Sequence, residues 1–323
     1  MQKKKTYLVT GGAGFIGSHL CEKIIKEGHK VICFDNLLTG SLKNLSLLHK
    51  NPRFSFIEGD ANKEEDIAPI FKNNKLDGVF HYASVIGVKR TLENPMSMLG
   101  DIDGIKNVAS LAVKYGKPKI VFASSSEVYG EPQQFPERED GAINPNNPYS
   151  YGVIKLLGER FFLLYAKEYN LKTCSLRFFN VYGPKQESSD YGFVVGIFIK
   201  KALKRKPLII FGDGSQTRDF TFIDDNIEAS WRAMESKGTQ DGEVINVGCG
   251  RPTTIVDLAE KIHGLCQPNK KFSPKFLENR RGDILHRFPE IKKMVKLLNY
   301  RPKVSLDEGL KKTIAWYKKS YAK

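Results

Sequence analysis

Two side chains that could do acid–base chemistry, Tyr151 and Lys155, stand four positions apart in the sequence Tyr-Gly-Val-Ile-Lys. That spacing places both side chains on the same face of a helix. A neighbouring ammonium stabilises a phenolate and lowers a tyrosine pKa that is normally about 10, which suits the tyrosine to act as a general base. The pair is weak evidence by itself, because a chain with 13 tyrosines and 51 Lys and Arg residues contains such pairs by chance.

Three serines and a glutamate, residues 124–127, precede this pair and directly follow an apolar run over 118–123. Ligands of a doubly wound sheet lie beyond the carboxyl ends of its strands, so these side chains should reach the region of the tyrosine. A serine hydroxyl there can orient a substrate hydroxyl for deprotonation. We therefore predict a catalytic role for a serine of this stretch, Ser125 or Ser126, with a simple turn after a strand as the alternative interpretation.

A glycine-rich stretch near the start of the chain, Gly11-Gly12-Ala13-Gly14-Phe15-Ile16-Gly17, indicates dinucleotide binding. The missing side chains let the backbone approach a pyrophosphate, and a helix N-terminus supplies N–H donors and a positive dipole end. A glycine pattern alone is a weak signal. Here it lies between a strand pattern over 6–10 and a helical pattern over 14–27, which is the context that gives the motif its meaning.

Asp35 stands eighteen positions beyond Gly17, at the end of the second apolar run. A carboxylate there accepts hydrogen bonds from both ribose hydroxyls and repels a 2′-phosphate, so the sequence favours NAD over NADP as the cofactor. The alternative interpretation is that Asp35 is only a turn residue before Asn36.

The elements that must position these groups alternate along the first half of the chain. Strand patterns cover 6–10, 30–35, 53–58, 77–81 and 118–123, and helical patterns cover 14–27, 63–73, 98–115 and 150–169. This alternation predicts an α/β fold, a Rossmann-type doubly wound parallel sheet. We expect residues 1–180 to form the NAD-binding domain with the Tyr/Lys helix. Residues 181–323, whose elements are shorter, should form mainly a smaller α/β substrate lobe, with segments that can return to the first domain.

Composition excludes several classes of protein. No apolar run reaches 18 residues, and the basic start of the chain has no apolar stretch of a signal peptide, so a cytoplasmic protein without a membrane partner is expected. Five cysteines without a C-x-x-C pair predict neither a disulfide framework nor a metal site. The net charge of +15 comes from residues spread along the whole chain. It predicts a lysine-rich surface that attracts anionic substrates, with no nucleic-acid partner.

Taken together, these motifs resemble the extended short-chain dehydrogenase/reductase superfamily, in its NAD-dependent nucleotide-sugar epimerase/dehydratase branch. The resemblance runs through nearly the whole chain, because segments 176–184, 211–220 and 280–283 are similar to the family's substrate-binding segments. It implies a nucleotide-sugar site formed by Ser126, Glu127, Tyr151, Asn180, Arg218, Arg281 and Asp283. Two arginines beside a diphosphate are also chemically sensible.

The resemblance also implies which residues contact NAD. They are Gly11, Gly14, Phe15, Ile16, Gly17, Asp35, Asn36, Asp60, Ala61, Tyr82, Ala83, Ser84, Tyr151, Lys155 and Phe178. Two positions depart from the family pattern: Asp101 stands where Asn is usual, and the stretch His81-Tyr82-Ala83-Ser84 is usually more apolar. A homodimer through the helices at 98–115 and 150–169 and a role in carbohydrate metabolism such as polysaccharide biosynthesis are implied in the same way.

The implied reaction begins when Tyr151 removes a proton from a sugar hydroxyl while hydride passes from C4 to NAD, which leaves a 4-keto sugar. Glu127 bears on the fate of this ketone. The dehydratases of the family carry an Asp-Glu pair at the positions that Ser126 and Glu127 occupy here, so the resemblance disfavours dehydration. The Ser-Glu sequence is similar to that of the UDP-glucuronate decarboxylases. Segments 147–151 and 176–184 are instead similar to the epimerases. We favour a UDP-sugar 4-epimerase. A UDP-glucuronate decarboxylase is the alternative, followed by a 4,6-dehydratase and a non-catalytic nucleotide-sensing protein.

Overall fold

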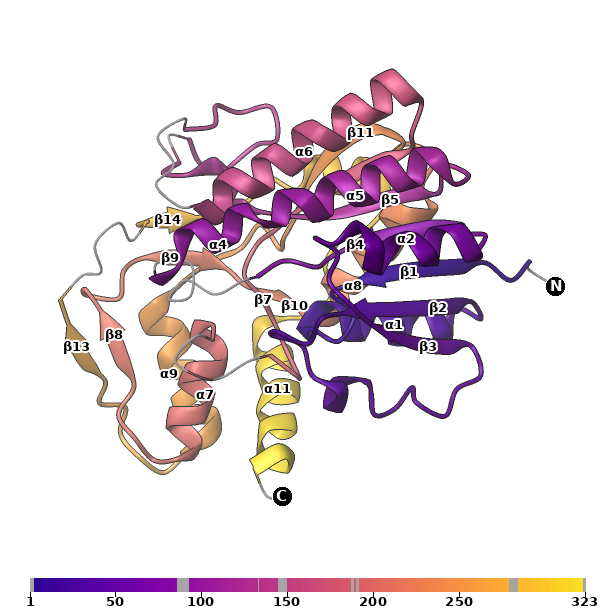
Figure 1. Ribbon diagram of the computed structural model, residues 1–323. Coiled ribbons are helices and arrows are strands. Elements are labelled where there is room, and N and C mark those ends of the chain that lie inside the picture. Colours follow the sequence, from indigo (N-terminus) through magenta and orange to yellow (C-terminus); the bar gives the residue numbers. More distant parts are fainter. Residues whose placement is uncertain are drawn as a thin grey trace.

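A sheet of seven parallel strands organises the chain (Figure 1). The computed structural model describes residues 3–85, 93–132, 134–144, 150–186, 189, 192–278 and 284–321. The strands of the sheet are β1 (Thr6–Thr10), β2 (Lys30–Asp35), β3 (Phe54–Glu58), β4 (Gly78–His81), β5 (Lys119–Ser125), β6 (Thr173–Phe178) and β11 (Asp241–Val247). Their order across the sheet is β11-β6-β5-β4-β1-β2-β3, which reverses direction between β1 and β4. The predicted doubly wound fold is confirmed, and its switch point lies where ligands of such sheets bind.

The strands other than the edge strand β3 are buried on both faces, because successive side chains point to opposite sides of the sheet and helices cover each side. In β1, Leu8 packs into one apolar cluster, whereas Tyr7 and Val9 pack into another. The first cluster is covered by the helices α2 (Glu64–Asn73), α5 (Asp101–Lys114) and α6 (Ser150–Tyr169), and the second by α1 (Phe15–Lys26) and α8 (Ile223–Glu235). Figure 1 shows α5 and α6 running side by side along one side of the sheet.

The helix expected over 98–115 is confirmed by the long helix of this region, except that residues 98 and 99 belong to a separate short helix before it. The structure divides this region into α4 (Pro95–Leu99) and α5, with Gly100 between them. The other predicted helices and strands begin and end within a few residues of the observed ones, and α6 matches its predicted range. Strand β6 was not predicted as a separate element, although Phe178 at its end was a predicted cofactor contact.

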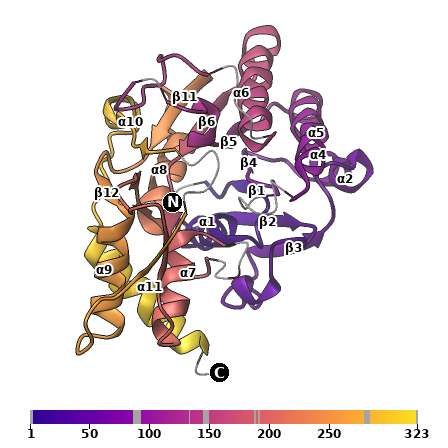
Figure 2. The ribbon, with the colours of Figure 1, turned by 90° about the vertical axis from the view of Figure 1, so that its left-hand side faces the viewer.

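The remaining described elements form a smaller lobe beside the sheet. It contains the helices α7 (Val194–Leu203), α9 (Ile255–Cys266), α10 (Lys292–Leu298) and α11 (Leu306–Tyr321). Short strands join them: β7 (Val181–Tyr182), β8 (Ile209–Phe211), β9 (Thr217–Asp219), β10 (Thr221–Phe222), β12 (Pro252–Thr254), β13 (Lys275–Leu277) and β14 (His286–Arg287). Short 3-10 turns, η1 (Leu42–Leu45) and η2 (Ser126–Tyr129), follow β2 and β5. Figures 1 and 2 both show α7, α9 and α11 gathered at one end of the molecule.

The chain crosses between the two parts more than once. After leaving the sheet at β6 it forms part of the lobe, and α8 then packs against the sheet and β11 pairs in parallel with β6. The apolar cluster on the α1 side continues from Val9 of β1 to Leu258 of α9 and Ile314 of α11. Within the described residues, no helix has both the length and the apolar character needed to cross a membrane.

Candidate active site

The glycine turn after β1 has no room for side chains. Gly11 adopts a left-handed φ of +68°, and a Cβ atom there would lie 2.7 Å from the Ala83 nitrogen. At Gly17, in the first turn of α1, a Cβ atom would lie 2.1 Å from the Gly11 carbonyl oxygen. Gly14 is the N-cap of α1 and has extended backbone. The glycines therefore allow a tight turn in which the backbone packs closely on itself and on Ala83, with Phe15 and Ile16 half-buried beside it.

Asp35 ends β2 and its carboxylate reaches the same turn. One oxygen accepts a hydrogen bond of 2.9 Å from the Ala13 N–H, and the other accepts one of 2.8 Å from the Leu37 N–H. Burial raises the pKa of Asp35, while these backbone donors lower it. Asn36 is exposed at the next position. A glycine turn at a helix N-terminus with a carboxylate beside it fits the pyrophosphate and the ribose of a dinucleotide.

The other predicted cofactor contacts lie after the neighbouring strands. Asp60 and Ala61 come after β3, where an Asp60 oxygen accepts a hydrogen bond of 3.0 Å from the Asn62 N–H. Tyr82 comes after β4, and its N–H donates to the Thr10 carbonyl over 3.2 Å. The ring of Phe178, at the end of β6, lies edge-on to the Tyr82 ring with 5.7 Å between centroids. The structure thus brings these residues to the carboxyl edge of the sheet.

Tyr151 and Lys155 lie in the first two turns of α6, as predicted. The Lys155 ammonium is buried, 5.5 Å from the centroid of the Tyr151 ring and 5.0 Å from that of Phe122. A hydrogen bond joins the side chain of Tyr151 to that of Ser125, the last residue of β5. Residues 124–127, called the serine loop below, therefore meet the start of α6 at one point.

Burial changes the acidity of both groups. It raises the pKa of Tyr151 above its ordinary value, although the hydrogen bond with Ser125 lowers it, and Glu127 and Asp101 add to the rise. Burial also lowers the pKa of Lys155 to about 8, which the Asp101 carboxylate partly opposes. The sequence predicted that the lysine lowers the tyrosine pKa. In the protein alone the largest influence on that pKa is instead the desolvation of the phenol, which raises it because loss of water penalises the charged form.

Asp101, which departs from the family pattern, has definite partners. One of its carboxylate oxygens accepts hydrogen bonds from the Ser84 hydroxyl over 2.7 Å and from the Val85 N–H over 3.1 Å. An asparagine oxygen could accept the same two bonds. The aspartate adds a negative charge close enough to influence both Tyr151 and Lys155.

Glu127 meets a residue that sequence reasoning missed. Its carboxylate forms an ion pair with Arg287 of β14, whose guanidinium also donates 2.5 Å to the Gly130 carbonyl. Ser126 lies buried at the start of the same 3-10 turn, and the Ser125 hydroxyl accepts a hydrogen bond of 3.1 Å from the Glu127 N–H. Arg287 is 160 positions from Glu127 in the chain, and no spacing rule relates two such distant positions.

A buried ion pair behind the serine loop was also missed. The Arg177 guanidinium donates two hydrogen bonds, of 2.8 and 2.7 Å, to the Glu159 carboxylate, which also accepts one of 2.5 Å from the Ser124 hydroxyl. Ser124 and Arg177 are partners in the β5–β6 register. Glu159 lies on α6 one turn beyond Lys155, so a spacing of four could have placed it on the same face.

Two of the four predicted substrate-lobe residues can be placed. Asn180 comes after β6, and within the described chain its buried side-chain nitrogen has no hydrogen-bond partner. Arg218 lies on β9, beside Arg287 in the β9–β14 register. Arg281 and Asp283 lie outside the described residues, so the structure does not place them.

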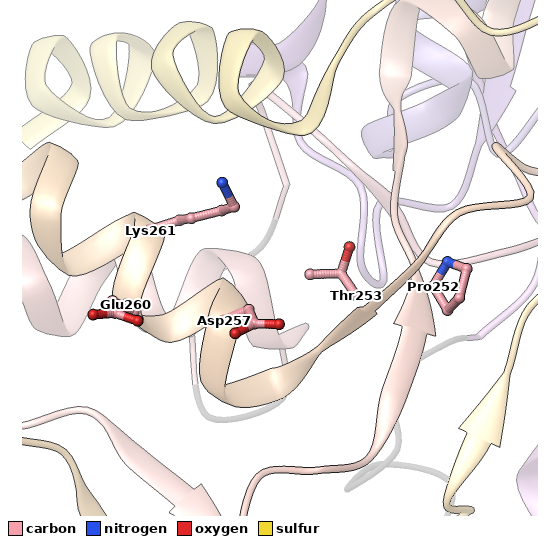
Figure 3. Close-up of a pocket in the computed structure, with 5 residues that line it drawn as sticks. All are labelled: Pro252, Thr253, Asp257, Glu260 and Lys261. Atoms are coloured by element: carbon pink, nitrogen blue, oxygen red, sulfur yellow. The ribbon is translucent and has the colours of Figure 1, made fainter.

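A separate hollow lies between β12 and the start of α9 (Figure 3). It is lined by Pro252, Thr253, Asp257, Glu260 and Lys261. None of the predicted site residues is among them, and the Lys261 ammonium bonds to Asp307 of α11 over 2.9 Å. Among the residues that the structure describes, no group of three or more His, Cys, Asp and Glu side chains could hold a metal ion. The candidate chemistry therefore lies at the strand ends.

Comparison with known proteins agrees with this site. The pattern of the NAD dependent epimerase/dehydratase family matches residues 7–248 of the chain. The chain belongs to this family, which confirms the resemblance and the expected cofactor.

Three similar proteins are informative. A UDP-N-acetyl-alpha-D-glucosaminuronate decarboxylase of Bacillus cytotoxicus is 37% identical and is matched over 98% of both chains. A putative UDP-glucose 4-epimerase of Methanocaldococcus jannaschii is 38% identical, over 96% of this chain and 98% of the relative. The crystal structure of a UDP-glucose 4-epimerase of Thermotoga maritima with UDP-glucose superposes with a TM-score of 0.90 at 36% identity, covering 98% of this chain and 99% of that one.

We predict that Gly17→Ala opens the glycine turn, because its new methyl group would press on the Gly11 carbonyl. Overpacking of this kind costs about 1–3 kcal/mol, so affinity for NAD should fall by about tenfold or more in calorimetric titrations. Gly264→Ala is the matched control, since nothing lies within 4 Å of a Cβ atom at Gly264 in α9. It should leave NAD binding unchanged. Equal NAD affinities of the two variants would contradict the account of the turn.

We also predict that Glu159 and Arg177 stabilise the folded protein only as a pair, so that removing either one costs nearly as much free energy of unfolding as removing both. Glu159→Gln or Arg177→Met alone should lower the free energy of unfolding by about 3–5 kcal/mol, because each leaves a buried charge without its partner. The double variant should cost much less than the sum of the two, as measured by urea unfolding. The exposed Glu308–Lys312 pair is the control, and its single variants should cost at most about 1 kcal/mol. Additive losses at 159 and 177 would refute the coupling.

Proposed function

We propose that this protein is an NAD-dependent 4-epimerase of UDP-sugars that works through a transient 4-keto sugar. The observation that carries the proposal is the meeting of Ser125 and Tyr151 beside the buried Lys155 ammonium. These groups lie at the carboxyl end of β5, on the same edge of the sheet as the glycine turn and Asp35. The epimerase relatives from Methanocaldococcus jannaschii and Thermotoga maritima support this reaction class.

In the proposed mechanism the chain binds, orients and moves protons. Tyr151 takes the proton of the sugar 4-hydroxyl, which Ser125 orients, and returns it when the ketone is reduced again. Lys155 supplies a positive charge beside the phenol during the step in which the phenol is ionised. NAD, when bound against the glycine turn and Asp35, supplies the hydride acceptor at C4. Asn180, Arg218 and Arg281 hold the diphosphate of the substrate, and Asp283 contacts its ribose.

A decarboxylase of a UDP-linked acidic sugar is the second candidate, and one contact favours it. The ion pair of Glu127 with Arg287 places a positive charge beside Glu127, which lowers the repulsion that Glu127 would exert on a carboxylate of the sugar. The decarboxylase from Bacillus cytotoxicus is as similar to this chain as the epimerases are. Both reactions begin with oxidation at C4, so the same Tyr151 would serve either one.

The test is turnover of UDP-glucose, UDP-N-acetylglucosamine and UDP-glucuronate, with the products identified by NMR. We expect 4-epimers, and we expect Tyr151→Phe to lower kcat by about 100- to 10,000-fold because the proton acceptor is lost. Tyr169→Phe, at the exposed end of the same helix, is the matched control and should keep full activity. Release of CO2 from UDP-glucuronate would instead identify the decarboxylase, and full activity of Tyr151→Phe would exclude both mechanisms.

We further propose that the protein forms a homodimer through α5 and α6. Three apolar side chains on one face of α6 are exposed: Val153 by 43%, Leu157 by 41% and Leu164 by 56%. Apolar side chains repeating along one helix face favour packing against another protein surface.

Leu157→Glu should convert the dimer into monomers, because it would place a carboxylate in the proposed apolar contact. Light scattering after size-exclusion chromatography measures the mass. Leu47→Glu is the control, since Leu47 is 79% exposed and lies on neither helix, so its mass should match that of the unmodified protein. A monomeric mass for the unmodified protein would overturn the proposal.

A further inference from the structure

Arg287 lies between two carboxylates at the sugar end of the candidate site. One terminal nitrogen of its guanidinium pairs with Glu127, and the other donates to the Gly130 carbonyl. The remaining nitrogen, Nε, lies 3.5 Å from a carboxylate oxygen of Glu137. The arginine is only 2% exposed, so each of its three nitrogens is turned toward a protein group rather than toward water.

Glu137 is held in this position by its backbone. Its N–H donates to the Phe288 carbonyl over 3.0 Å, and its carbonyl accepts bonds of 2.8 Å from the Glu290 N–H and 2.9 Å from the Asn246 side chain. These bonds tie the segment to the stretch of chain just after β14, the strand that carries Arg287. The Glu137 side chain is therefore brought to Arg287 by main-chain geometry.

The carboxyl of Glu137 is buried with little to stabilise its charge. The residue is 2% exposed, and within the described residues neither oxygen has a hydrogen-bond partner. Burial raises the pKa of Glu137 to about 8, and the negative charge of Glu127 adds to the rise. Arg287 from β14, Arg218 from β9 and the backbone of Phe288 lower this pKa, but by less than burial raises it. Near neutral pH the group is therefore mostly the uncharged acid.

We propose that Glu137 is a positioning residue that lies against the Nε side of Arg287, opposite Glu127, and that its ionisation sets the net charge of these three groups at the sugar end of the site. With Glu137 uncharged, Arg287 and Glu127 together carry no net charge. With Glu137 ionised, the three groups together are negative. An acidic group on the sugar would then meet repulsion, whereas a neutral sugar would not. This inference rests on the proposed function only in taking a UDP-sugar as the ligand.

The test compares the binding of UDP-glucuronate and UDP-glucose by calorimetry at pH 6.5 and at pH 9. The ratio of their dissociation constants should shift against UDP-glucuronate by about fivefold or more as the pH rises through about 8. In Glu137→Gln, which keeps the size and removes this ionisation, the shift should be clearly smaller, and what remains of it should come from Lys155, whose pKa is also about 8. Asp140→Asn is the matched control, because Asp140 lies in the same loop, is exposed and pairs with Arg138. It should show the same pH shift as the unmodified protein.

Each outcome decides the proposal. If the ratio of the two dissociation constants does not change with pH in the unmodified protein, the proposal is overturned, even where Glu137→Gln does not fold. If the folded Glu137→Gln variant shows the same shift as the unmodified protein, the proposal is overturned as well. Binding is measured without turnover, so an inactive protein whose ratio shifts as expected would refute the proposed reaction and keep the role of Glu137. Where neither sugar nucleotide binds, infrared difference spectra supply the measurement. A carboxylic-acid carbonyl band that disappears near pH 8 and is missing from Glu137→Gln supports the proposal, and its absence from the unmodified protein overturns it.

Discussion

The buried ion pair of Glu159 and Arg177 is the interaction on which the geometry of the site depends. Arg177 of β6 stands between Ser124 of β5 and Asn246 of β11 in the strand register, and Glu159 reaches it from α6. The Ser124 hydroxyl joins the same carboxylate, so the serine loop and the catalytic helix are fixed to one point of the sheet. A pair that satisfies several hydrogen bonds in a dry interior tolerates few other arrangements, because any displacement leaves a buried charge unpaired.

The pKa values of the groups around this point depend more on burial than on ion pairs. Tyr151 and Lys155 both lose water, which moves their pKa values in opposite directions toward the uncharged forms. Carboxylates approach from two sides, Asp101 from α5 and Glu127 from η2. A cation beside the phenol would oppose their effect on it. The phenol of Tyr151 is therefore held in its uncharged form, whereas Lys155, with a pKa of about 8, still carries its positive charge near neutral pH.

Local patterns carried most of what the sequence could predict. The glycine turn, Asp35 and the Tyr151/Lys155 spacing each occupy a short window, and their physical requirements can be recognised there. Arg287 and Glu137 could not be found in this way, because only the folded lobe brings β14 beside the serine loop. The break at Gly100 was missed because apolar periodicity continues across it. Tertiary contacts therefore supplied this part of the site.

The return of the chain to the sheet through β11 affects how the molecule can be divided. A fragment ending near residue 180 would lack this strand, and β6 would become an open edge with unpaired backbone groups. The fragment would also expose the side of the sheet that α8 covers. Such an edge invites pairing with other chains, so the first half of the chain is not a self-sufficient folding unit. A chimera that exchanges the smaller lobe between two relatives would therefore have to keep α8 and β11 from the protein that supplies the sheet.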